Sequence, residues 1–357
     1  MINVTKTFLP DFEAYTAVLK RAWDKTWITN NGELVVELEE KLKQFLGVKE
    51  LLFCSNGTVV IQMALKVMNI TKEVITTPFS YVATTNTILW EGCTPVFVDI
   101  DSATLCIDAA KIEAAITDDT QAILATHVYG IPCDIEKIDA IAKKYNLKVI
   151  YDAAHAFGCT YKGKSLLSYG DISTCSFHAT KVFHTVEGGC IIANDEAISK
   201  QLFLYRSFGH IGDDYFCMGI NAKNSELHAA MGLCILPKLP EIISARKNGF
   251  DRYNQLLNFK KLQQPSFERN LQYNYSYYPV IFNSEEILLK LKEALIKNNI
   301  LVRRYFYPSL NQLPFTGNVQ LCPVSEDVSK RVLSLPLYAD LPERDVERIC
   351  TIINENI

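Results

Sequence analysis

The sequence predicts an α/β protein with a mostly parallel sheet. Two patterns carry this prediction: short β-branched runs alternate with helical stretches, and the runs are almost continuously apolar. Strands of a parallel sheet have this composition because crossover helices bury both of their faces. The expected strands are residues 50–54, 73–77, 95–100, 122–127, 148–152, 172–177 and 189–194. The helices expected between the earlier strands are residues 57–68, 81–90, 109–116 and 135–145.

Helical patterns flank this alternation on both sides. In residues 33–47 the apolar side chains fall on one helical face, and Gly47 is a natural stop. That face consists of Leu34, Val35, Leu38, Leu42, Phe45 and Leu46. A longer helical stretch runs over residues 225–256, with interruptions expected at Pro237 and Pro240.

The pattern changes after this long stretch. The expected elements are a strand at 274–282, a helix at 285–299, a strand at 300–308 and a closing helix at 343–357. The sequence therefore predicts two domains. A large α/β domain, which includes the N-terminal helical segment, covers residues 1–249, and a smaller α+β domain covers residues 250–357.

Composition excludes several classes of protein. The formal net charge of −4 gives no basic footprint for nucleic acid or for a membrane surface. The 11 cysteines form no C-x-x-C pair, and several lie in apolar runs, as expected of buried thiols in a reducing compartment. The N-terminus has no signal-peptide pattern, and no stretch reads as a membrane span. We therefore expect a cytoplasmic protein.

Polar residues follow several of the expected strands. Parallel sheets bind ligands at the carboxyl ends of their strands, so these residues are the first candidates for a site. Residues 55–58, Ser-Asn-Gly-Thr, open a helix and could cradle a phosphate, or they could be an ordinary N-cap turn. The aromatic residues after 73–77 could stack on a flat ring or belong to the core. Asp152 could be a cap or a paired carboxylate, and His155 alone would more often be structural.

Lys181 lies five residues after Ser176 and before a Glu-Gly-Gly turn. A lysine in a loop is usually solvated, but here small residues precede it and Phe183 follows. Apolar surroundings would lower the proton affinity of its amine, as imine formation requires. A phosphate cradle, a stacking aromatic, an aspartate and a lysine at one sheet edge together describe a site for pyridoxal 5'-phosphate (PLP).

The chain also resembles a known family, the DegT/StrS-type sugar nucleotide aminotransferases. Segments with counterparts in that family occur in order along nearly the whole chain: SNGT, TPFSYVATTNTI, PVFVDID, THVYG, DAAHAFG, SFHATK with EGG, GIN, ELHAAMG and SLPLY. The resemblance implies PLP as cofactor and the aspartate aminotransferase-like fold, fold type I. Within the family the chain looks most like dTDP-4-amino-4,6-dideoxyglucose transaminases. Residues 26–42, TWITNNGELVVELEEKL, resemble a segment more often seen in 4-amination than in 3-amination, and RRYFYP at 303–308 resembles dTDP-4-amino-4,6-dideoxyhexose enzymes.

The resemblance also implies roles for individual residues. Lys181 would be the catalytic residue and hold the cofactor aldehyde as a Schiff base, and Asp152 would pair with the ring nitrogen. The other cofactor contacts would be Gly57 and Thr58 amides and the Ser176 hydroxyl at the phosphate, Tyr81 stacked on the ring, His155 near the ring hydroxyl, and Asn221 at the phosphate of a neighbouring subunit. A homodimer with shared sites follows. Val186 and Lys223 depart from the family, where glycine and arginine are frequent.

The implied reaction is a ping-pong transfer of an amino group from L-glutamate, which leaves as 2-oxoglutarate, to a nucleotide-linked keto sugar. The favoured acceptor is dTDP-4-keto-6-deoxy-D-glucose, giving dTDP-4-amino-4,6-dideoxy-D-glucose. Lys223, Arg303 and Arg304 are candidates for the sugar phosphates. The alternatives are a 3-aminating or dehydrating sugar enzyme and a non-catalytic PLP-binding regulator. An NAD-dependent oxidoreductase is disfavoured because no G-x-G-x-x-G follows the first strand.

Overall fold

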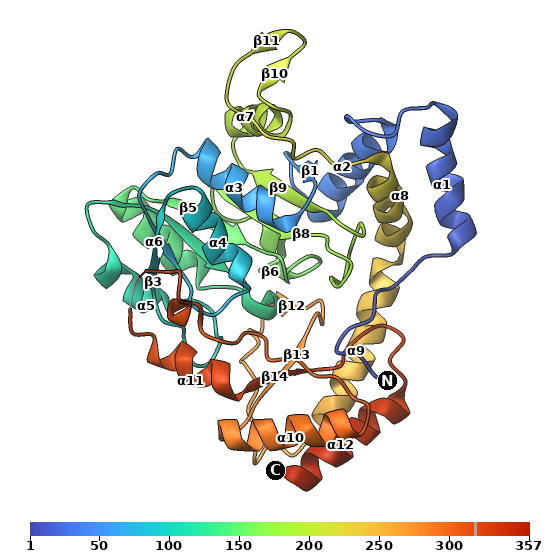
Figure 1. Cartoon of the computed structure of the whole chain (residues 1–357), viewed down its shortest axis with the longest axis vertical. Helices are drawn as coiled ribbons and strands as arrows, with labels where there is room; N and C mark the ends of the chain where they lie inside the picture. The colour runs from blue at the N-terminus through green and yellow to red at the C-terminus, as the bar shows by residue number, and fades with distance from the viewer. Residues whose placement is uncertain (318–319) are drawn as a thin grey trace.

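A computed structural model describes residues 1–317 and 320–357. Its centre is a seven-stranded sheet with the order β1-β9-β8-β5-β4-β2-β3 (Figure 1). The strands are β1 Leu52–Cys54, β2 Glu73–Thr76, β3 Thr94–Phe97, β4 Thr120–Thr126, β5 Lys148–Asp152, β8 Ile172–Ser176 and β9 Gly189–Ala193. All seven expected strands are confirmed. β9 pairs antiparallel with β8 and β1, and the other pairs are parallel, so the predicted mostly parallel sheet is confirmed.

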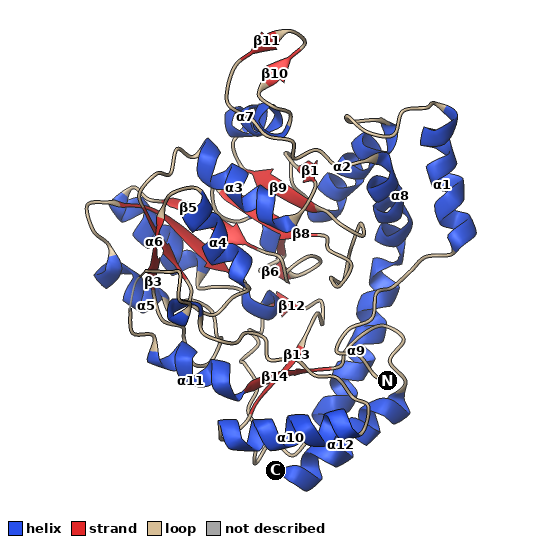
Figure 2. Cartoon of the chain, viewed as in Figure 1, coloured by secondary structure: helices blue, strands red, loops and turns tan. Residues whose placement is uncertain are grey.

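Helices cover both faces of this sheet (Figure 2). Successive residues of β5 show the alternation, since Val149 and Tyr151 pack in one apolar cluster and Ile150 packs in another. The first cluster takes side chains from α2 Glu33–Leu46, α5 Ala109–Ile112, α6 Ile135–Tyr145 and α8 Glu226–Ile235. The second takes side chains from α3 Gly57–Val67, α4 Val82–Trp90 and α7 Glu196–Arg206. A sheet buried on both faces leaves its strand ends as the place for polar chemistry.

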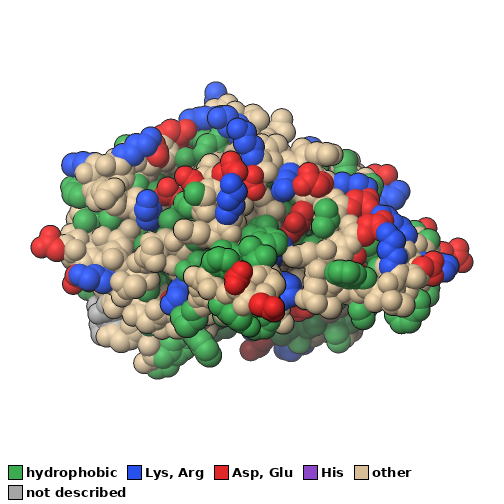
Figure 3. Space-filling view, turned by 90° about the horizontal axis from the view of Figure 1, so that it is seen from above, with side chains coloured by type: hydrophobic (Ala, Val, Ile, Leu, Met, Phe, Trp, Pro, Cys, Tyr) green, Lys and Arg blue, Asp and Glu red, His purple; other side chains and the backbone are tan. Residues whose placement is uncertain are grey.

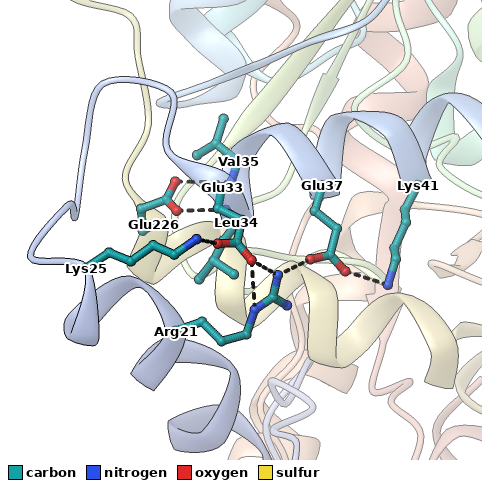
Figure 4. A network of polar contacts seen from close by, with 8 residues as sticks. All are labelled: Arg21, Lys25, Glu33, Leu34, Val35, Glu37, Lys41 and Glu226. Atoms are coloured by element: carbon teal, nitrogen blue, oxygen red, sulfur yellow. Dashed lines mark hydrogen bonds and ion pairs between the residues drawn. The ribbon is translucent and has the colours of Figure 1, made fainter.

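The N-terminal helices are tied to α8 by a polar network (Figure 4). The buried Glu226 carboxylate accepts the Leu34 and Val35 amides at 2.7 and 3.1 Å and so caps α2. Arg21, on α1 Phe12–Asp24, pairs with Glu33 and, at 2.7 Å, with Glu37. α2 ends at Gly47, as predicted, with a φ of 66°. On the expected apolar face only Phe45 is exposed.

The C-terminal part forms a third apolar cluster around β13 Tyr278–Ile281 and β14 Val332–Leu335, an antiparallel pair. α9 Leu239–Leu256, α10 Glu285–Lys297 and α12 Glu343–Asn356 pack on this pair, and Ile2 joins the same cluster. A small antiparallel sheet joins the two parts of the chain. In it, β12 Leu271–Gln272 pairs with β6 Thr160–Tyr161, and β6 pairs with β7 Lys164–Ser165. The domain boundary at residues 249/250 stays a prediction. Two contacts cross it: Ile2 packs in the C-terminal cluster, and β12 pairs with β6.

The strand expected at 300–308 is wrong. This segment makes only two isolated bridges, Ile300 with Ile2 and Arg303 with Ser334, and then turns away. The reason lies in packing: the buried Phe306 ring stacks on His155 at 5.5 Å and meets Phe79 edge-on at 5.6 Å. Burying this ring over the strand ends outweighs continuing the ladder. α11 Pro323–Arg331 follows, and β14 was not foreseen as a strand.

The long helical stretch consists of α8, a 3-10 turn at Leu236–Lys238 and α9. Pro237 falls in that turn, as predicted, and Pro240 sits in the first turn of α9, where proline is tolerated. By length and hydropathy, residues 226–256 alone among the described helices could cross a membrane. Half of that apolar window is buried within the protein, as in a core helix.

Charges of both signs are interspersed over the face that carries the β10–β11 hairpin, with hydrophobic side chains between them (Figure 3). The hairpin, β10 His210–Ile211 and β11 Asp214–Tyr215, projects from the body (Figure 1). Its exposed apolar side chains are Phe208, Ile211, Tyr215, Phe216 and Met218.

Candidate active site

The strand ends open into a cavity of ≈ 260 Å³. Seven of the eight residues that the sequence predicts as site residues line it: Gly57, Thr58, Tyr81, Asp152, His155, Ser176 and Lys181. They come from the carboxyl ends of β5 and β8 and from the segments that follow β1, β2, β5 and β8, which is the arrangement expected at the carboxyl edge of a parallel sheet.

The first wall of the cavity is the start of α3. Asn56 caps this helix by accepting the Thr58 and Val59 amides at 3.0 and 2.8 Å. The Thr58 amide is therefore engaged, whereas the Gly57 amide has no acceptor among the described residues. A Cβ on Gly57 would lie 2.6 Å from Ser176 Cβ, so only glycine lets the helix start approach β8 this closely. The Gly57 amide and the Thr58 and Ser176 hydroxyls together form a concave anion site at a helix N-terminus.

Asp152 is 5% exposed at the end of β5. Its carboxylate accepts the Thr84 hydroxyl at 2.7 Å and the Ala154 amide at 3.1 Å. It makes no ion pair with any residue that the structure describes. Burial raises the pKa of Asp152, and the hydrogen bonds from Thr84 and Ala154 and the charge of Lys181 lower it only in part. A buried acid of this kind has room for one cationic partner from outside the chain.

His155 is held as a neutral donor. Its Nδ1 accepts the Tyr129 amide at 3.2 Å, which places the remaining proton on Nε2. Burial lowers the pKa of His155 well below its usual value, and the Lys181 charge lowers it further. The ring lies parallel to Phe306 and edge-on to Tyr277, at 5.5 and 5.0 Å. A neutral imidazole with Nε2–H free suits an oxygen that carries negative charge.

Lys181 is half-buried between the cavity and Tyr277. Burial by itself lowers the pKa of Lys181, but the nearby Tyr277 and Asp152 outweigh it, and the pKa lies above its usual value. The direction predicted from sequence, a lowered pKa, is therefore wrong for this chain. The apolar walls are present, and the error comes from Tyr277 and, after it, the Asp152 carboxylate, neither of which the sequence showed to be close to Lys181.

The loop that carries Lys181, residues 177–188, is closed by its glycines. A Cβ on Gly188 would lie 2.0 Å from Thr185 Oγ1, and a Cβ on Gly189 would lie 2.6 Å from the Asn56 carbonyl oxygen. Val186 has a φ of 68°, in the left-handed region that β-branched residues avoid. This backbone explains why glycine suits the position at which the sequence departs from the family.

Asn221 lies outside the cavity and is exposed. Its side-chain oxygen accepts the Lys223 amine at 3.1 Å, and Lys223 also lies over the Phe208 ring. Both residues sit at the base of the projecting hairpin. The sequence assigned Asn221 to the site of a neighbouring subunit, and that role stays a prediction.

Several residues of the cavity were not foreseen as cofactor contacts: Asn56, His178, Thr180, Glu187, Tyr277, Tyr305 and Phe306. Of the candidates for sugar phosphates, Arg303 lines the cavity. Arg304 instead donates to Glu285 at 2.7 Å and to the Lys330 carbonyl at 2.9 Å, so it has a structural role. The tyrosine-rich run at 273–278 was the one available signal for Tyr277, since such runs are unusual in a plain strand.

Comparison with known proteins decides the family. The family model described as DegT/DnrJ/EryC1/StrS aminotransferase family matches residues 12–354. The chain belongs to this aminotransferase family. It is therefore an enzyme, and the resemblance seen in its motifs is confirmed.

Curated relatives narrow the resemblance. This aminotransferase is 41% identical to a dTDP-4-amino-4,6-dideoxy-D-glucose transaminase of Shigella dysenteriae, over 99% of this chain and 98% of that protein. It is 40% identical to the Escherichia coli enzyme of the same name, with the same coverage. A GDP-perosamine synthase of Escherichia coli O157:H7 is 34% identical over 93% of this chain and 92% of its own.

Solved structures confirm the fold. DesI, crystallised in the presence of its TDP-sugar product, superposes with a TM-score of 0.94 at 31% identity, over 99% of this chain and 92% of its own. The aminotransferase PseC of Helicobacter pylori, described as involved in pseudoaminic acid biosynthesis, superposes with a TM-score of 0.90 at 27% identity, over 99% and 98%. The predicted fold-type-I architecture is thereby confirmed.

Proposed function

We propose that this aminotransferase uses PLP to move the amino group of L-glutamate to dTDP-4-keto-6-deoxy-D-glucose. The products are 2-oxoglutarate and dTDP-4-amino-4,6-dideoxy-D-glucose. The observation that carries the proposal is the buried, unpaired Asp152 carboxylate in one cavity with Lys181. The choice of sugar substrate is supported by the two dTDP-4-amino-4,6-dideoxy-D-glucose transaminases that are 41% and 40% identical to this chain over nearly its full length.

The cavity suits PLP in charge and shape. A phosphate matches the Gly57 amide and the Thr58 and Ser176 hydroxyls, where a side chain on residue 57 would fill the cradle. A pyridinium N–H supplies the cationic partner that Asp152 lacks within the described chain. The His155 Nε2–H suits the ring hydroxyl, and the exposed Tyr81 ring at the start of α4 suits the ring face. When bound, PLP supplies an electron sink and carries the amino group between the two substrates.

The chain's own residues then have distinct tasks. Asp152 holds a proton on the ring nitrogen, and its burial strengthens that contact. With PLP bound, Lys181 Nζ would hold its aldehyde, and the same amine would move the substrate proton as general base and acid. His155 stays neutral near neutral pH, because burial keeps its pKa low, and so remains a hydrogen-bond donor throughout.

The second substrate requires an anion-binding group in the same cavity, because a ping-pong enzyme receives donor and acceptor in turn. Arg303 is the arginine that lines the cavity in the described chain, and we assign it to the phosphates of the nucleotide sugar or to the donor carboxylate. The Asn221 side chain would complete the phosphate site of a neighbouring subunit in a homodimer, and the exposed apolar hairpin beside it supports such an interface. A cytoplasmic location stays a prediction.

The test is spectroscopic and chemical. Purified protein is mixed with PLP, and its absorption is followed before and after L-glutamate is added. We expect a cofactor band that borohydride fixes covalently to Lys181, and a change of that band with glutamate. Adding dTDP-4-keto-6-deoxy-D-glucose should restore the band, and NMR of the product should show nitrogen at C4. Nitrogen at C3 or loss of water would support the 3-aminating or dehydrating alternative, and a band unmoved by glutamate would support the regulator.

A further inference from the structure

Three buried hydroxyls lead to the Asp152 carboxylate. Thr84 Oγ1 donates to Asp152 Oδ2 at 2.7 Å, Ser80 Oγ lies 2.9 Å from Thr84 Oγ1, and Thr126 Oγ1 lies 3.1 Å from Ser80 Oγ. None of these three side chains is more than 1% exposed. They come from different elements: Thr126 ends β4, Ser80 precedes Tyr81, and Thr84 lies in the first turn of α4.

The proton on each hydroxyl fixes the direction of this hydroxyl chain. An ionised carboxylate can only accept, so Thr84 gives its one proton to Asp152. The Thr84 oxygen then accepts from Ser80, and the Ser80 oxygen accepts from Thr126. All three O–H dipoles therefore point toward Asp152 when it is ionised. Aligned hydrogen bonds strengthen one another in a buried, low-dielectric setting.

We propose that Thr84, backed by Ser80 and Thr126, is a positioning residue that holds the Asp152 carboxylate in its ionised form and in a fixed plane. This inference rests on the proposed function, in which an ionised Asp152 keeps the cofactor ring nitrogen protonated. It also assigns a role to Ser80 and Thr84 in the segment SYVAT (residues 80–84), in which only Tyr81 had a predicted role.

The surroundings of Asp152 show why such a device is needed. The titratable groups that face it are Lys181 from the loop after β8, Cys175 from β8 and the neutral His155 from the turn after β5. Burial favours the protonated acid, and Thr84 is the strongest of the effects that oppose burial, ahead of the Ala154 amide and the Lys181 charge. Once Lys181 is engaged in chemistry, the hydroxyl chain is the support that remains constant.

The test compares matched variants of the full chain without added PLP. Thr84→Val keeps the shape and removes the hydroxyl, Thr84→Ser keeps the hydroxyl, and Thr87→Val removes a buried hydroxyl of the same helix that donates to the Thr84 carbonyl instead. Aspartate is labelled with 13C at its carboxyl carbon, and the Asp152 signal is identified by its loss in Asp152→Asn. We expect Asp152 to titrate about one to two pH units higher in Thr84→Val, the shift equivalent to losing a hydrogen bond to a charged group.

In Thr84→Ser and Thr87→Val, Asp152 should titrate at the same pH as in the wild type. An unchanged Asp152 titration in Thr84→Val would overturn the proposal, as would an equal shift in Thr87→Val. If Thr84→Val does not fold, Ser80→Ala takes its place. We then expect a smaller upward shift of the Asp152 titration, and the absence of any shift would contradict the proposal. The titration needs no cofactor, so failure of the wild type to bind PLP would refute the proposed function separately.

Discussion

The buried ion pair behind the phosphate cradle allows a quantitative test of the fold. Arg206, on α7, is 1% exposed in its side chain, and its partner Glu39, on α2, is 12% exposed. Arg206 Nη1 donates to Glu39 Oε1 at 2.5 Å and to the Phe53 carbonyl at 2.9 Å. The same Glu39 oxygen accepts the Phe53 amide at 2.8 Å. The pair thus fixes β1 just before residues 55–58 enter the site.

Glu39→Ala leaves a buried guanidinium without its carboxylate and a buried amide without its acceptor. Breaking a buried pair by removing one partner costs about 3–5 kcal/mol, out of a total stability of about 5–15 kcal/mol. We expect a fall in Tm of roughly 4–7 °C, because the unfolding entropy of 357 residues is about 0.75 kcal/mol/K. Urea unfolding followed by circular dichroism, with calorimetry for Tm, measures both quantities.

The matched control lies on the same helix as Arg206. Glu196 pairs with Lys200 at i,i+4, and both side chains are at least 70% exposed. Glu196→Ala should cost less than about 1 kcal/mol. The double variant Glu39→Leu with Arg206→Met should recover most of the stability lost in Glu39→Ala, because it leaves no uncompensated charge; the remaining cost is that of the Phe53 amide without its acceptor, about 1–3 kcal/mol. If Glu39→Ala costs no more than Glu196→Ala, the assignment of Arg206 as a desolvated charge is wrong.

Three further predictions concern the site. Lys181→Ala should keep the fold and lose turnover, and a wild-type rate in the glutamate assay would refute its catalytic role. Asp152→Asn should raise Tm at pH 7, because the raised pKa of Asp152 makes its ionised form costly there; this gain should vanish as pH falls below about 4, the ordinary pKa of the acid, and a calorimetric pH series checks it. His155→Gln should reduce the loss of stability as the pH falls below about 6.5, because a histidine kept neutral by burial costs about 1.4 kcal/mol per pH unit there. If the urea midpoint falls with pH as steeply in the variant as in the wild type, this prediction is wrong.

The large sheet was predictable from sequence because its strands are local and apolar on both faces. Each strand reads as one short run, and the polar residues at its end, such as Asp152 and Ser176, stand out against that run. Their convergence then follows from the rule that parallel strands end at one edge. This rule brought the candidates together, and the resemblance to the family then singled out the seven site residues that line the cavity.

The opposite wall of the cavity was not predictable by the same reasoning. Tyr277 and Phe306 reach the site from more than 90 residues away in sequence, held by contacts between distant segments. Tyr273, for example, donates its hydroxyl to the Tyr129 carbonyl at 2.9 Å, and Asn274 donates to the His155 and Phe157 carbonyls. No local period encodes such contacts. The prediction of a strand at 300–308 is wrong for this reason: its aromatic residues, such as Phe306, pack against rings of distant segments instead of extending a sheet.

Asp152 is the point at which stability and chemistry oppose each other in this fold. A carboxylate at the end of a fully buried strand lowers stability at neutral pH, and an asparagine or apolar residue would suit the sheet better. The chain keeps the acid and surrounds it with donors that are themselves buried, Thr84 directly and Ser80 and Thr126 behind it. Hydroxyls do this without a second charge, which leaves the carboxylate's attraction for a cationic ring nitrogen undiminished. A permanent arginine at the position of Thr84 would stabilise the fold more and would cancel the charge on which the chemistry depends.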